Sequence, residues 1–234
     1  MSYSKSLNGI FAAAMLACAI VAAPAPAAEP PIPQSGTGDW RGSLQAFSKD
    51  NFKHPAWGHA HSVRIFNLAK SLAKQDKKTV DDDVLFATAM MHDIAAFQQW
   101  AVADKDHADR AVDLLPSLLN KAGFPQAKIP AVLEAVRTHM FDRTPVSNEA
   151  IYLHDADALD WMGAVGAFRL MAMVEVGDAQ PNAQAALGLL QQRLAQVPAG
   201  VASKAGKKEA KIRERSLKKF LDELRSQSGN LEQL

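Results

Sequence analysis

A histidine and a carboxylate stand side by side where an apolar run of the chain ends. His92 and Asp93 directly follow residues 84–91, which have a helix-forming composition. The run begins after three acids, residues 81–83, which are typical of a helix N-terminus. A helix this apolar is expected to be buried on most faces, and a buried ionised aspartate is costly unless a cation compensates its charge. Imidazole nitrogen and carboxylate oxygen are natural ligands of a divalent metal, although an adjacent pair alone is a weak signal.

Further polar residues recur at wide spacing: His61 with Arg64, then His139, then the run from Asp155 to Asp160. Each lies on or at the end of a predicted apolar helix, where unpaired polar groups are expensive. The helices of a bundle can bring such residues to one interior site. Two imidazoles and two carboxylates would leave positions on a six-coordinate ion for a water and a substrate phosphate oxygen. The four ligands of this hypothesis are His61, His92, Asp93 and Asp157.

The elements that must position these residues are predicted to be helices throughout. Apolar residues recur at helical spacing, and no strand-like alternation of any length appears. Gly123 is expected to end one helix, and Pro130 to stand early in the next. Gly163 and Gly166 are expected to allow close packing ahead of the helix that follows them. The predicted helices cover residues 39–52, 58–75, 82–92, 107–123, 130–138, 147–159, 168–176, 183–196 and 204–225.

The N-terminus has the composition of a secretory signal. Lys5 precedes an uninterrupted apolar run over residues 10–23, and residues 25–27 offer the small side chains that a signal peptidase requires. The run is short for a membrane span, which needs about 20 apolar residues. We therefore expect an exported, periplasmic or secreted protein with no stable membrane anchor after cleavage; the alternative is an uncleaved anchor. The only cysteine, Cys18, lies inside this signal, and its lipidation is a minor alternative.

Composition limits the chemistry and the partners of the mature chain. The 234 residues are 48% hydrophobic and 22% charged, which is ordinary for a globular domain with a sizeable core. Without Cys18 there is no thiolate ligand, so histidine and carboxylate ligands favour Mn, Mg, Fe or Ni. Basic and acidic residues nearly balance, so we expect neither a nucleic acid polymer nor an anionic membrane as partner. The expected partner is a small-molecule phosphoester, and the oligomeric state stays open.

This pattern resembles the HD-domain superfamily of metal-dependent phosphohydrolases. The resemblance extends from about residue 54 to residue 176 and rests on motifs in a fixed order. They are residues 61–65 (family pattern His-x-x-Arg-Val), residues 91–94 around His92-Asp93, and residues 156–160. Residues 163–169 look like the Gly-Ala-x-Gly-x-x-Arg stretch of one bacterial branch. The resemblance implies an all-α HD-domain helical bundle in which His61, His92, Asp93 and Asp157 hold the first metal.

Some HD proteins hold a second metal with additional histidines between the His-Asp pair and the last aspartate. His107 and His139 lie in that interval and are the candidates. The alternative is that both contact phosphate or support the ligands. The Gly-Tyr-Pro triplet of the cyclic-di-GMP phosphodiesterases is missing, which argues against that subclass. On this basis the chain divides into a signal peptide (1–28), a linker and N-terminal segment (29–52), an HD domain (53–180) and a C-terminal helical extension (181–234).

The expected reaction is hydrolysis of a phosphoester by a metal-activated water, with a nucleotide as one candidate substrate. Asp93 would orient the water as general base, and His139 would protonate the leaving group or bind phosphate. Arg64 would neutralise a phosphate oxygen or else pair with Asp160 or Asp155. Weaker phosphate candidates are Arg169 and Lys105. Residues interpreted as packing, structural or exposed are Trp57, Trp161, His54, His59 and His154.

Two alternative functions stay open. Some helical HD relatives with six His/Asp ligands are di-iron oxygenases, and this reading requires both His107 and His139 to ligate. The other alternative is a non-catalytic exported binding protein that keeps the fold. No chemistry is predicted in the charged helix over residues 204–225, which is interpreted as a lid or packing helix over the core. No residue reads a base or a sugar, so the sequence does not define the substrate.

Overall fold

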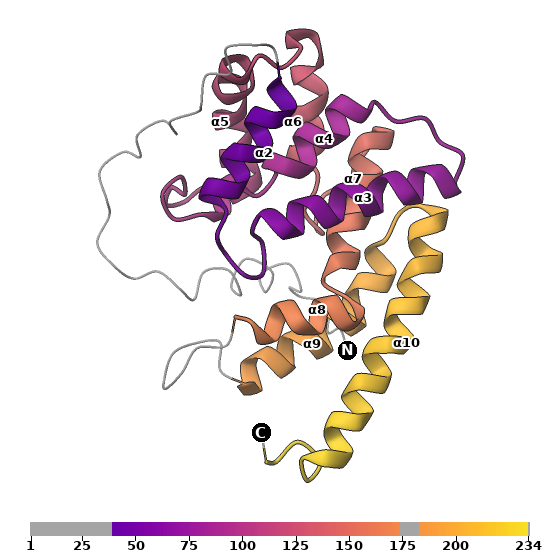
Figure 1. Cartoon of the computed structure of the whole chain (residues 1–234). Helices are drawn as coiled ribbons and strands as arrows, with labels where there is room; N and C mark the ends of the chain where they lie inside the picture. Colours follow the sequence, from indigo (N-terminus) through magenta and orange to yellow (C-terminus); the bar gives the residue numbers. More distant parts are fainter. Residues whose placement is uncertain (1–38, 174–182, 234) are drawn as a thin grey trace, which may run out of the picture.

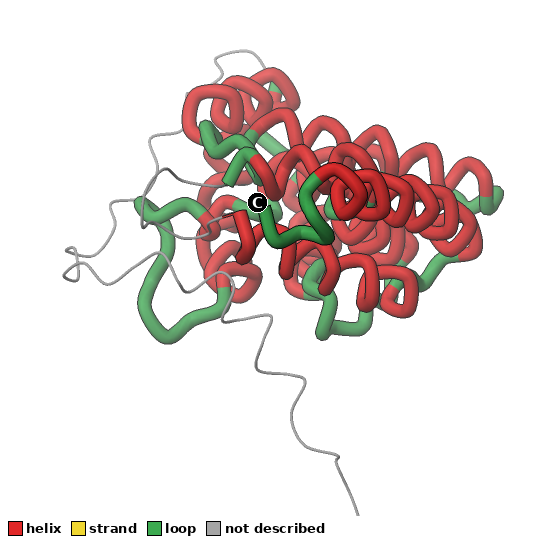
Figure 2. The backbone as a smooth tube through the Cα atoms, turned by 90° about the horizontal axis from the view of Figure 1, so that it is seen from below, coloured by secondary structure: helices red, strands yellow, loops and turns green. Residues whose placement is uncertain are grey.

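A computed structural model describes residues 39–173 and 183–233 of the chain. Within these ranges the regular elements are α-helices and short 3-10 turns, which confirms the predicted all-α fold (Figure 2). The predicted signal peptide, residues 29–38 of the linker and residues 174–182 lie outside the described part. No helix of the described part is long and apolar enough to cross a membrane. The elements are α2 (Trp40–Asn51), α3 (His59–Gln75), α4 (Asp82–Met91), η1 (Ile94–Ala96), α5 (His107–Ala122), η2 (Gln126–Lys128), α6 (Ile129–Arg137), α7 (Asn148–Asp160), α8 (Gly163–Met171), α9 (Ala183–Gly200) and α10 (Lys204–Gln227).

Short polar side chains define where most helices begin. The Asp81 carboxylate accepts hydrogen bonds from the backbone N–H groups of Asp83 and Val84 at the start of α4. Such a cap satisfies donors that have no partner within the helix and contributes about 1 kcal/mol. Gly123 ends α5 in the left-handed conformation that favours glycine, at φ 82°. The other side-chain caps are Asp39 for α2, Asp106 for α5, Ser147 for α7 and Ser203 for α10.

The centre of the fold is formed by α3, α4 and α7. Helices α3 and α7 lie against each other, α4 packs on both, and α2 and α6 cover other sides of α4 (Figure 1). Residues 84–91 of α4 are all buried, because this helix is apolar on every side. Complete burial of a side chain such as Leu85 contributes about 1.5–3 kcal/mol. This packing leaves the C-terminal end of α4, with His92 and Asp93 beyond it, inside the protein.

The last helices form a layer against α7 and the helix that follows it. Helix α10 packs along α8, α9 and α7 and forms one side of the molecule (Figure 1). The turn before α10 is fastened to the core through Asp155 of α7, whose carboxylate accepts the N–H groups of Ala202 at 2.8 Å and Ser203 at 2.7 Å. Asp76, at the end of α3, accepts the N–H of Ala205 at 3.1 Å. The C-terminal extension is therefore docked on the core through the carboxylates of Asp155 and Asp76.

Two helices differ from the prediction by more than two residues at a boundary. Helix α8 begins at Gly163 rather than at residue 168. Gly163 has φ +67°, which lets the chain turn from α7 directly into α8. A Cβ on Gly166 would lie 2.2 Å from the carbonyl carbon of Trp161, so this position also requires glycine. Helix α9 continues through Pro198 to Gly200, because a proline near the helix end removes only one hydrogen bond.

Candidate metal centre

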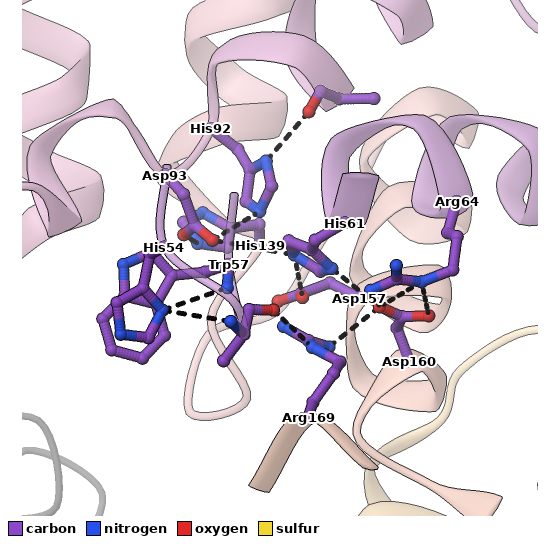
Figure 3. A network of polar contacts seen from close by, with 12 residues as sticks. His54, Trp57, His61, Arg64, His92, Asp93, His139, Asp157, Asp160 and Arg169 are labelled. Atoms are coloured by element: carbon purple, nitrogen blue, oxygen red, sulfur yellow. Dashed lines mark hydrogen bonds and ion pairs between the residues drawn. The ribbon is translucent and has the colours of Figure 1, made fainter. Parts of the chain in front are cut away.

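Six histidine and aspartate side chains come together in the interior of the fold. They lie within or at the ends of α3, α4, α5, α6 and α7. These residues form overlapping groups of three in which the potential ligand atoms lie within 4.8 Å of one another. All are buried except His107, which is half-buried. Five of them meet in one cluster in Figure 3, and His107 faces Asp93 from α5. The cluster consists of His61, His92, Asp93, His107, His139 and Asp157.

Asp93 lies at the centre of the cluster and faces two sets of histidines. Its Oδ2 lies 3.1 Å from His92 Nε2 and 3.6 Å from His61 Nε2. Its Oδ1 lies 3.5 Å from His107 Nε2 and 3.8 Å from His139 Nε2. Asp157 Oδ1 lies 3.2 Å from His61 Nε2 and so belongs to the first set. The arrangement therefore offers ligands on both sides of one carboxylate.

Three histidines direct the same ring nitrogen into the cluster. The Nδ1 atoms of His92 and His139 lie 3.1 and 2.6 Å from the carbonyl oxygens of Ala89 and Val136. A carbonyl can only accept, so both Nδ1 atoms carry a proton and both Nε2 atoms are free to coordinate. His61 Nδ1 likewise lies 2.8 Å from a carboxylate oxygen of Asp160.

Two buried nitrogen atoms test whether a metal fits. In the part of the chain that the structure describes, His61 Nε2 and His92 Nε2 have no hydrogen-bond partner of suitable geometry. Buried polar atoms are normally satisfied, and each unsatisfied one costs about 1–3 kcal/mol. A cation between these nitrogens and the nearby carboxylates would satisfy both. The residues present therefore fit a divalent metal.

The electrostatics of the cluster also favour a cation. Burial opposes ionisation of Asp93, but His92, His107 and His61 hold the pKa of its carboxyl well below the usual value. The pKa of Asp157 is also lowered, because His61 and His92 outweigh its burial. Burial, with the charges of His92 and His107, lowers the pKa of His139 to about 4. Ionised carboxylates beside a neutral imidazole are the protonation states that metal ligands require.

Asp160 supports the cluster from behind His61. Its carboxylate accepts hydrogen bonds from Arg64 Nε at 3.0 Å, Arg64 Nη2 at 2.9 Å and Arg169 Nη1 at 2.9 Å (Figure 3). Arg64 is thus paired with Asp160, which was one of its two predicted roles. A carboxylate that holds the far nitrogen of a histidine fixes the orientation of the ring. Asp160 was not predicted to act on a ligand, although its position one turn after Asp157 places both on the same side of α7.

The remaining candidates are distributed around the site. Arg169 is buried, and its Nε donates to the carbonyl oxygen of Ala56 at 2.5 Å. Lys105 pairs with Asp113 in an exposed contact and is not a member of the cluster. Trp57 stacks on His54 with the ring centroids 3.3 Å apart, and this pair lies beside Asp93 in Figure 3. The other histidines bond away from the cluster, His59 to Ser48 and His154 to Asp155.

The fold and the site together define the class of this protein. It is an all-helical domain whose centre holds a candidate metal site of paired histidines and aspartates. The family model of the HD domain matches residues 58–162, a segment that contains all six cluster residues and Asp160. Residues 58–162 therefore belong to the HD-domain superfamily. No curated protein matches the chain.

Solved structures share the fold over most of the chain. A predicted HD superfamily hydrolase from an uncultured Thermotogales bacterium is 24% identical, with a TM-score of 0.55, and the match covers 79% of this chain and 90% of that one. An HD-superfamily hydrolase from Bacillus thuringiensis is 20% identical, with a TM-score of 0.58 and coverages of 80% and 95%. YpgQ from Bacillus subtilis, solved in complex with ADP, is 17% identical, with a TM-score of 0.61 and coverages of 80% and 94%. At these identities the likeness concerns the fold.

Proposed function

We propose that the protein is a metal-dependent phosphohydrolase that cleaves a small phosphoester. The observation that carries this proposal is the pair of buried, unsatisfied nitrogens, His61 Nε2 and His92 Nε2, beside two ionised aspartates. When bound, a divalent ion supplies the Lewis acidity that activates a water for attack on phosphorus. The ADP complex of the structurally similar YpgQ supports a nucleotide as the substrate class. We also propose export from the cytoplasm, on the basis of the predicted signal. That signal lies outside the described residues.

Each residue of the cluster has a proposed task. His61, His92, Asp93 and Asp157 hold the divalent cation, with Mn, Mg, Fe and Ni as candidates. Asp93 is 8% exposed and is the residue that can both hold the ion and accept a proton from the attacking water. Asp160 keeps the His61 ring in place and is positioned in turn by Arg64.

The hydrogen bonding of His139 changes its proposed task. Its Nδ1 proton is donated to the Val136 carbonyl, and its pKa of about 4 leaves Nε2 without a proton at neutral pH. A neutral imidazole in this state is a better ligand than a proton donor to a leaving group. We therefore place His139 with His107 in the second set of ligands around Asp93 Oδ1.

This second set also supports one other candidate function. Because His107 and His139 both face Asp93 Oδ1, the cluster has the six His/Asp ligands that a di-iron oxygenase would need. Metal analysis of protein purified without added ions separates the two functions. Two irons per chain with visible charge-transfer absorption would support the oxygenase, whereas Mn, Mg or Ni in place of iron supports the phosphohydrolase.

The test of the proposed function is a phosphoesterase screen with nucleotides and simple phosphomonoesters over several divalent ions. His92→Ala and Asp93→Ala should each abolish metal-dependent turnover while the helical circular dichroism is retained. His59→Ala is the matched control, because this histidine bonds to Ser48 rather than to the cluster, and its turnover should remain. Retained turnover in both cluster variants would overturn the assignment. A wild type that binds metal but hydrolyses nothing would instead favour the non-catalytic binding protein.

A further inference from the structure

Two buried arginines lie on helices that follow the matched HD segment. That segment ends at residue 162, whereas Arg169 lies on α8 and Arg193 lies on α9 in the C-terminal extension. Arg169 is 1% exposed and Arg193 is 8% exposed. Such burial is unusual for arginine, which is rarely buried without a compensating charge.

One aromatic ring brings the two guanidinium groups together. The Arg169 guanidinium carbon lies 3.7 Å from the centroid of the Trp161 ring, and that of Arg193 lies 5.4 Å from the same centroid. Arg193 also lies 5.5 Å from the Phe141 centroid, so its guanidinium is held between two rings. Aromatic faces attract cations and fix the plane of a guanidinium. Both guanidinium groups are therefore held against the same ring.

Both arginines are close enough to the cluster to interact with the charge of Asp157. Arg169 is beside Asp157 and Asp160 in Figure 3 and donates Nη1 to Asp160. Its Nη2 is buried and has no hydrogen-bond partner among the described residues, so one donor of the fork remains unused. Burial lowers the pKa of Arg193 to about 10, while Asp157 attracts and Arg169 repels its charge. The two guanidinium groups thus share an electrostatic environment with a proposed metal ligand.

The balance of charge changes when the centre holds a metal. Without one, the ionised carboxylate of Asp157 attracts the guanidiniums of both Arg169 and Arg193. A divalent ion adds two positive charges to this enclosed region. Uncompensated charge is costly in a protein interior, so the loaded site favours a bound anion. A phosphate dianion has the charge required, and its oxygens match the planar donors of arginine.

We infer that Arg169 and Arg193 form an anion-binding subsite beside the metal centre, which takes the phosphoryl group of the substrate. Arg169 Nη2 and the Arg193 guanidinium donate to its oxygens, and Trp161 holds both arginines in place. Helix α9 thus completes the site. The link to turnover rests on the proposed phosphohydrolase function, whereas the binding of phosphate does not.

Isothermal titration calorimetry with inorganic phosphate tests the subsite directly, using the full mature chain loaded with Mn²⁺. Arg193→Met removes the charge but keeps a long apolar chain between the two rings. It should weaken phosphate binding by about tenfold or more, the scale of one charge-assisted hydrogen bond, and should leave Mn²⁺ affinity unchanged. Arg193→Lys keeps the charge without the planar fork and should lose less. Arg215→Met removes the same charge from an exposed site on α10 and should bind phosphate like the wild type.

Several results would overturn the subsite. They are a loaded wild type that binds no phosphate at millimolar concentration, a folded Arg193→Met variant with wild-type phosphate affinity, and an equal loss in Arg215→Met. If Arg193→Met does not fold by circular dichroism, the lysine variant decides, and wild-type phosphate affinity in that variant counts against the subsite. Turnover separates the two proposals. A wild type that hydrolyses phosphoesters but binds phosphate independently of Arg193 refutes only the subsite, and one that binds phosphate through Arg193 without hydrolysis refutes only the phosphohydrolase.

Discussion

Replacing Asp160 with asparagine tests how strongly the framework behind His61 controls the metal centre. The carboxylate holds His61 Nδ1 at 2.8 Å and receives Arg64 and Arg169, and these partners keep the pKa of Asp160 well below its usual range. Asparagine has the same shape but no charge, and its amide group would face guanidinium donors. His61 would lose a fixed orientation, and two cations would lose their counter-ion.

The size of the effect follows from the burial of each partner. Loss of a carboxylate that orients a metal-binding histidine costs about 10–100-fold in metal affinity. Arg169 is buried, so breaking its pair should reduce the free energy of unfolding by about 3–5 kcal/mol. The Arg64 side chain is 36% exposed, so its pair adds about 1 kcal/mol or less. A domain in the upper part of the typical range of about 5–15 kcal/mol would remain folded at room temperature.

Calorimetric titration with Mn²⁺ and urea unfolding of the metal-free protein measure the two effects separately. Asp155→Asn is the matched control, because this buried carboxylate lies on the same helix but caps the turn before α10. The control should lose stability and keep its Mn²⁺ affinity within about twofold, since it removes no contact to a proposed ligand. If folded Asp160→Asn binds Mn²⁺ as tightly as the wild type, Asp160 does not position His61. Equal losses of affinity in both variants would show that general destabilisation is the cause.

Two further predictions concern stability. Gly166→Ala should lower the free energy of unfolding, measured by urea titration, by about 1–3 kcal/mol, because its Cβ would meet the Trp161 backbone at 2.2 Å. Gly188→Ala in α9 is the control. Its Cβ has nothing within 4 Å, so this variant should be neutral or stabilising in the same titration. Burial and the charge of Arg169 lower the pKa of His54 to about 4. The unfolded chain therefore binds a proton at His54 at a higher pH than the folded chain does. As a result, stability is lost as the pH falls from about 6.5 to about 4. His54 is half-exposed, so His54→Gln should reduce this loss by only about 1 kcal/mol, and an unchanged pH profile would contradict the shift.

Local signals made most of the helices predictable. The apolar run over residues 84–91 and the acids before it define α4, and Gly123 marks the end of α5. The start of α8 was missed because its first residues are glycines, which periodicity treats as breakers. Gly163 has a positive φ, and Gly166 lies against the Trp161 backbone. Both requirements depend on how closely two backbone segments approach, which a local sequence pattern does not show.

The sequence predicts those residues of the candidate site that belong to motifs occurring in a fixed order along the chain. Each of the six cluster residues stands on or next to a helix whose apolar face could be recognised, and the bundle brings them together. Arg193 carries no such signal, because it is a lone basic residue in an otherwise uncharged helix. Its position between Phe141 and Trp161 depends on how α9 packs on the domain. The sequence places Arg64 near His61. It does not decide whether Arg64 pairs with Asp160 or contacts phosphate, because that also depends on how the helices pack.

The anchoring of the α9–α10 turn on Asp155 has a consequence for how the molecule comes apart. If the last two helices detached, this carboxylate would remain in an apolar interior without its two backbone donors, only two residues from Asp157. Such an intermediate is unfavourable, so separation of these helices and melting of the core should occur in one cooperative transition. A fragment trimmed to the matched HD segment would therefore lose rigidity at the aspartate proposed to hold the ion.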